Sequence, residues 1–61
     1  MSYSELIATE RARFERAPMS QLRSTRLALA IHAWGNTTEE KARAEAIEAI
    51  IHARLRAKRK P

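Results

Sequence analysis

The stretch WGNTTEE, residues 34–40, decides how this chain folds. It contains the only glycine of the chain, Gly35, at a place where a helix commonly ends in a left-handed residue. Thr37, with Glu40 three residues later, has the spacing of a capping box, which starts a helix. The stretch therefore predicts a tight turn between two helices.

The sequence on both sides of this turn favours helix. It is rich in alanine, the strongest helix former, and contains no valine. We predict helices over residues 18–34 and 38–59. A short loop between two long helices makes them antiparallel neighbours, so the expected fold is all-α and built on an antiparallel helical hairpin.

Residues 3–16 predict a further helix before the hairpin. Ser2 and Glu5 form another capping box, and an apolar stripe follows that is interrupted by Glu10. Pro18 lacks an amide hydrogen and disfavours helical angles at the residue before it. We therefore expect a break just before Pro18, with a single helix kinked at the proline as the alternative.

The length of the chain, 61 residues, allows one small domain with a marginal core. There is no cysteine and there are only two histidines, so we expect no disulfide, metal or other cofactor. Oligomerisation is the remaining way to complete a core. Trp34 is expected to close the end of the hairpin, with an exposed interface anchor as the alternative. We predict a homodimeric helical bundle whose shared core contains Leu27, Ile31, Trp34, Ile47, Ile50 and Ile51.

The charge distribution favours an anionic partner. The net charge is +5, and nine of the twelve basic residues are arginine, which suits bidentate contacts to phosphate or carboxylate. No acidic residue follows Glu48, so residues 55–61 form a basic C-terminal tail. The candidate residues for binding nucleic acid or an acidic partner are Arg11, Arg13, Arg16, Arg54, Arg56, Lys58, Arg59 and Lys60.

A purely structural interpretation of the tail is also open. Cations at a helix C-terminus stabilise the helix dipole by about 0.3–1 kcal/mol each. However, Arg54 and Lys58 are four residues apart and repel each other. Either Glu10 and Glu15 of the first helix neutralise the tail, or the tail stays cationic for a partner.

Catalysis and membrane insertion are poorly supported. A single glycine leaves no room for a P-loop or a dinucleotide-binding fingerprint. The longest apolar run, residues 27–34, is far shorter than the ~20 residues that span a bilayer, and the N-terminus lacks the pattern of a signal peptide. We expect a cytoplasmic protein that is not an enzyme and has no small-molecule substrate.

The segment Ala12-Arg13-Phe14-Glu15-Arg16 is similar to part of the first helix of the Rop family. These plasmid copy-number regulators dimerise into four-helix bundles and bind RNA hairpins. The resemblance implies a dimer, an RNA ligand and an exposed Phe14. The helical periodicity of the present chain instead places Phe14 on the apolar stripe with Ile7. The chain also departs from the Rop pattern in Pro18, in its later turn and in its basic charge.

These observations together predict a small nucleic-acid-binding regulator that contacts phosphates. The alternative is a protein-binding adaptor or inhibitor of the phage or plasmid type, which docks the same basic surface on an acidic protein. Association of a basic amphipathic helix with a membrane surface is a third interpretation, but the apolar faces are needed for the fold.

Overall fold

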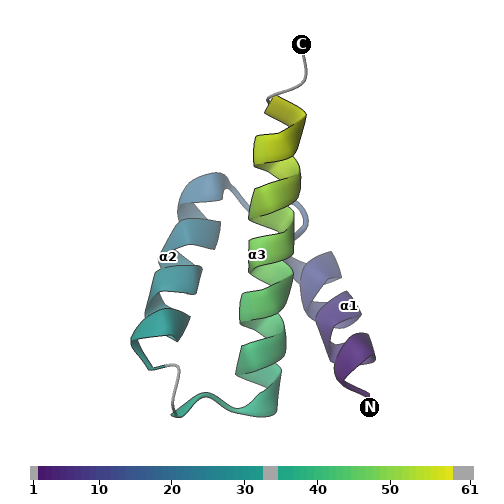
Figure 1. Ribbon diagram of the computed structural model, residues 1–61, viewed down its shortest axis with the longest axis vertical. Coiled ribbons are helices and arrows are strands. Elements are labelled where there is room, and N and C mark those ends of the chain that lie inside the picture. Colours follow the sequence, from purple (N-terminus) through teal and green to yellow (C-terminus); the bar gives the residue numbers. More distant parts are fainter. Residues whose placement is uncertain (1, 33–34, 59–61) are drawn as a thin grey trace.

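The computed structural model describes residues 2–32 and 35–58. Over these residues the chain is all-helical, with α1 at Tyr3–Phe14, α2 at Met19–Ile31 and α3 at Thr38–Lys58. Figure 1 shows α3 in the centre, with α2 antiparallel to it on one side and α1 on the other. The predicted all-α class is confirmed, and α2 and α3 form a helical hairpin.

The start of α1 follows the predicted capping box. Ser2 has extended backbone angles, and its Oγ accepts a hydrogen bond of 3.2 Å from the amide of Glu5. The same hydroxyl donates to Oε1 of Glu5 at 3.1 Å. One of the amides that a helix start leaves without a partner is therefore satisfied by a side chain.

The chain breaks between α1 and α2. α1 ends at Phe14, two residues earlier than predicted, and the amide of Ala17 donates to the Phe14 carbonyl at 3.1 Å. Pro18 has φ −67° and ψ 152°, which is extended backbone, and α2 begins at the next residue. Proline thus precedes the second helix, where its missing amide hydrogen does no harm.

The turn between α2 and α3 differs from the prediction. α2 ends at Ile31, three residues earlier than expected. Gly35 does not adopt the left-handed conformation that was predicted for it. The side-chain amide of Asn36 instead donates to the carbonyl of Leu29 at 3.0 Å, satisfying a group that a helix end leaves free. Because Asn36 supplies this cap, the glycine is not needed in a special conformation.

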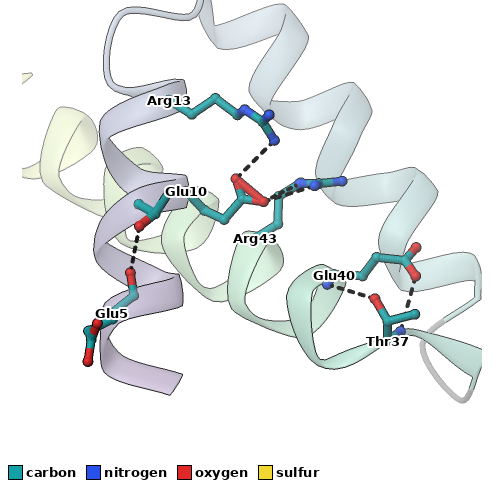
Figure 2. A network of polar contacts seen from close by, with 7 residues as sticks. Glu5, Glu10, Arg13, Thr37, Glu40 and Arg43 are labelled. Carbon is teal, nitrogen blue, oxygen red and sulfur yellow. Dashed lines mark hydrogen bonds and ion pairs between the residues drawn. The ribbon is translucent and has the colours of Figure 1, made fainter. Parts of the chain in front are cut away.

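The start of α3 confirms the second capping box. The amide of Glu40 donates to Oγ1 of Thr37 at 3.2 Å, and the amide of Thr37 donates to Oε1 of Glu40 at 3.1 Å (Figure 2). The backbone and side-chain hydrogen bonds from Thr37 hold the pKa of the Glu40 carboxyl below its usual value. α3 ends at Lys58 within the described residues, close to the predicted end at residue 59.

The core lies along α3, between the two other helices. Its buried cluster consists of Leu22, Leu29, Ile47, Ile50 and Ile51. Phe14 is half-buried and packs against this cluster, as the apolar stripe predicted. Two alanines of α3, Ala42 and Ala46, are fully buried as well. Such small side chains allow a neighbouring helix to approach closely.

Candidate partner-binding surfaces

Glu10 of α1 is the buried charged residue of the described chain, with 6% of its surface exposed. Nε and Nη2 of Arg43 on α3 both lie 2.9 Å from its Oε1 (Figure 2). Nη1 of Arg13 lies 3.4 Å from its Oε2. This arrangement satisfies a carboxylate that would be expensive to bury alone, and it fixes α1 on α3. Glu10 is therefore engaged away from the basic tail.

Arg43 was not among the residues predicted from sequence. A glutamate that interrupts an apolar stripe indicates a buried cation partner, because an unpaired charge is not tolerated in a core. The chain contains nine arginines, and the local pattern gives no reason to choose the one at position 43. Only the packing of α1 against α3 identifies it.

A second polar contact joins the same two helices. The hydroxyl of Tyr3 donates a hydrogen bond of 2.8 Å to Oε2 of Glu45. This hydrogen bond raises the pKa of the Tyr3 phenol, and desolvation and the negative charge of Glu45 add to the effect. The contact lies on the surface and helps to hold the beginning of α1.

The predicted binding arginines in and just after α1 are all exposed. The side chain of Arg11 is 51% exposed, and its Nε lies 3.9 Å from Oε2 of Glu15. Arg13 is 65% exposed, although one of its nitrogens contacts Glu10. Arg16 is exposed and follows the end of α1. All three guanidinium groups remain open to solvent on at least one side.

Arg54 connects the end of α1 to the last turns of α3. Its Nη2 donates a hydrogen bond of 2.8 Å to the backbone carbonyl of Glu15. The next residue after Glu15 is Arg16, and Lys58 lies one helical turn beyond Arg54. The structure therefore brings together basic residues that are about forty positions apart in the sequence.

We refer to Arg16, Arg54, Arg56 and Lys58 as the basic end. Figure 1 shows that α3 extends past α2 here. Arg16, Arg56 and Lys58 are exposed, whereas Arg54 is half-buried. In the described ranges, none of the ion pairs involves Arg16, Arg56 or Lys58. The two remaining predicted residues, Arg59 and Lys60, lie outside the described residues.

Five of the six residues predicted to form a shared dimer core lie within the described residues, and these five fall into two groups. Ile47, Ile50 and Ile51 are buried within one chain, because α1 and α2 cover both flanks of α3. Leu27 and Ile31 point away from this core and are 63% and 62% exposed. Trp34, the last of the set, lies outside the described residues.

Other kinds of site find no support in residues 2–32 and 35–58. No group of three or more His, Cys, Asp or Glu side chains is placed to hold a metal ion in this part of the chain. His32 and His52 are both exposed. Among the same residues, no helix combines the length and the apolar character that crossing a membrane requires.

No protein-family model, curated protein or solved structure matches this chain. The similarity of residues 12–16 to the Rop family is therefore not accompanied by a match of the whole fold. The function has to be inferred from the chain's own residues and their arrangement.

Proposed function

We propose that this protein is a small, non-enzymatic regulator that binds nucleic acid through phosphate contacts made by its basic end. The observation that carries the proposal is the hydrogen bond of 2.8 Å between Arg54 and the Glu15 carbonyl. It holds Arg16, just after the end of α1, near the last turns of α3, so exposed basic residues surround one end of the molecular surface. A DNA duplex presents one negative charge about every 1.7 Å, so each exposed cation on such a surface can neutralise a phosphate.

The fold explains the position of one of these cations, Arg54, but it gains little stability from the others. Arg54 caps the end of α1 by donating to a carbonyl there, so its position follows from the fold. Arg56 and Lys58 lie in the last turn of α3 and stabilise its dipole, by about 0.3–1 kcal/mol each. Lys58 is also repelled by Arg54, one turn earlier, by about 0.2–0.5 kcal/mol. A bound phosphate would offset this repulsion. It would also contact cations that contribute little to the stability of the fold.

We also propose that the protein acts as a homodimer. A chain of this length buries only about 60% of the surface that its unfolded form exposes, which leaves a single copy marginally stable. Leu27 and Ile31 supply apolar surface that one copy leaves uncovered. A dimer would carry two basic ends.

Two charge-matched double variants test phosphate binding. R56Q/K58Q removes two charges from the basic end, whereas R26Q/K41Q removes two charges from a groove between α2 and α3. Both variants have the same net charge. Binding to a labelled DNA duplex and to an RNA hairpin is followed by fluorescence anisotropy over a range of salt concentrations. Circular dichroism verifies that both variants remain helical.

We expect R56Q/K58Q to weaken binding and to lower the slope of log K against log[salt] on duplex DNA by about 1.8, or 0.9 for each lost phosphate contact. R26Q/K41Q should leave the slope close to that of the native protein. Equal losses in both variants would show that net charge, not the basic end, drives binding. An affinity for nucleic acid that does not depend on salt would contradict phosphate binding. Absence of binding to both nucleic acids would also contradict it and leave the adaptor that docks on an acidic protein as the alternative.

A further inference from the structure

α2 is apolar on two opposite sides. Leu22 and Leu29 are buried against α3. At 100° per residue, Leu27 and Ile31 lie on the opposite side of the helix, and about two thirds of each is exposed. Within the described residues, no other large apolar side chain is as exposed as these two. A helix with apolar residues on two sides indicates that both sides are covered in the working protein.

The exposed side of α2 has a regular pattern. Ser20, Ser24, Leu27 and Ile31 follow one another at spacings of four, three and four residues, which is the spacing of a coiled-coil seam. We call these four residues the outer face of α2. All four are exposed. The first half of the seam is small and polar, and the second half is large and apolar.

We infer that the outer face of α2 binds the same face of a second copy, with the two α2 helices antiparallel about a twofold axis. In this arrangement Ser24 faces Leu27 of the second copy, and Ser20 faces its Ile31. Large side chains then pack against small ones along the whole seam. A parallel pair would set leucine against leucine and serine against serine, leaving gaps at one end.

The exposed area and the helix dipoles support a second copy of the chain as the partner that covers the outer face of α2. The chain exposes 4701 Å², whereas a compact monomer of 7.0 kDa is expected to expose about 4,000 Å². The excess of roughly 700 Å² is a property of the whole chain, including the end of α3 that extends past α2, and it leaves room for an interface near the ~800 Å² that each partner buries in a standard one. Antiparallel helices also place the positive end of one dipole beside the negative end of the other.

This inference rests on the homodimer proposed above and specifies its interface, but it does not depend on phosphate binding. Sedimentation equilibrium of the native chain should give twice the mass of 7.0 kDa. L27Q/I31Q should raise the dissociation constant at least ~100-fold, because a twofold axis makes each substitution count twice. Its helicity should be unchanged, since neither side chain belongs to the core. L55Q, at an apolar residue of α3 that is 38% exposed, is the matched control and should remain dimeric.

Single cysteines test the direction of pairing, since the native chain has none. A mixture of S20C and I31C chains should crosslink efficiently with a short bis-maleimide. Each variant alone should not, because two copies of either position lie about 16 Å apart along antiparallel helices. Efficient crosslinking of S20C alone would overturn the antiparallel arrangement. This test does not require L27Q/I31Q to fold.

Two sedimentation results would overturn the inference. One is a native chain that stays at 7.0 kDa at all concentrations, and the other is a dimer that L27Q/I31Q does not weaken. Neither measurement uses nucleic acid, so a result that overturns the dimer interface does not affect the proposal of phosphate binding. Conversely, a loss of salt-dependent binding in the anisotropy assay would leave the dimer standing.

Discussion

α1 and α2 pack against the same central helix, but the contacts that hold them differ in kind. α2 meets α3 through buried leucine and isoleucine side chains, and in the described residues no ion pair joins these two helices. α1 is attached to α3 by the buried pair of Glu10 and Arg43 and by the hydrogen bond from Tyr3 as well. The buried charge pair adds a directional constraint to the packing, because Oε1 of Glu10 has to face the guanidinium group of Arg43. α1 is therefore held on α3 by directional polar contacts in addition to packing, whereas the described contacts between α2 and α3 are apolar.

The largest effect should come from the apolar side. Leu22 of α2 is fully buried, and L22A leaves a cavity against α3. We expect a loss of about 2–5 kcal/mol in the free energy of unfolding, which is enough to unfold much of so small a domain. Urea denaturation followed by circular dichroism measures it. Q21A, at the exposed neighbour of Leu22 and outside the outer face of α2, is the control and should lose far less. Comparable losses in both variants would show that α2 is not oriented as described.

The charge pair on the other side should have an intermediate effect. E10Q removes the charge that Arg43 and Arg13 contact, and we expect it to destabilise the chain by about 1–3 kcal/mol. E10L/R43M replaces the pair by apolar side chains and should come within about 1 kcal/mol of the native protein or exceed it. E15Q, at an exposed pair 3.9 Å long, should change the stability by less than ~0.5 kcal/mol.

These three variants are compared in one urea denaturation series. An E10L/R43M chain as unstable as E10Q would mean that Glu10 contributes through something other than its charge partner. A loss in E15Q as large as that in E10Q would mean that burial does not distinguish the two pairs.

The smallest effect concerns the hydrogen bond at the start of α1. The pKa of Tyr3 is raised above 10.0 by its bond to Glu45, so the folded state holds this proton more tightly than the unfolded state does. The stabilisation is therefore fully present below pH 10.0 and is lost as the pH rises through the raised value. Tyr3 is the only tyrosine, so ultraviolet titration reads its pKa directly. E45Q should move that pKa back down, and an unchanged titration curve would show that the bond does not form in solution.

Local features of the fold were predictable, and those set by packing were not. Both capping boxes and the break at Pro18 depend on neighbouring residues, and the structure has them. The conformation of Gly35 was predicted wrongly because Asn36 competes to cap the same helix. A pattern of residue types shows that a glycine is suited to a turn, but not which of two caps forms.

The candidate site shows the same division. The sequence indicated which residues are basic, but the contact that gathers them uses the backbone carbonyl of Glu15, which no residue pattern reveals. On α2, the periodicity marks two apolar sides, one with Leu29 and one with Leu27. Only the packing against α3 decides that Leu29 is covered and Leu27 is left exposed.

The attachment of α1 also has a consequence for the order of folding. The polar contacts of α1 with α3 join residues 33, 39 and 42 positions apart. α2 and α3 are joined by a turn of a few residues, so their contacts close shorter loops. Each doubling of loop length adds about 0.6 kcal/mol of closure entropy, so we expect the hairpin to form first and α1 to dock last. The basic end needs α1 in place, and it is therefore the last part of the molecule to be assembled and the first to be lost when the molecule opens.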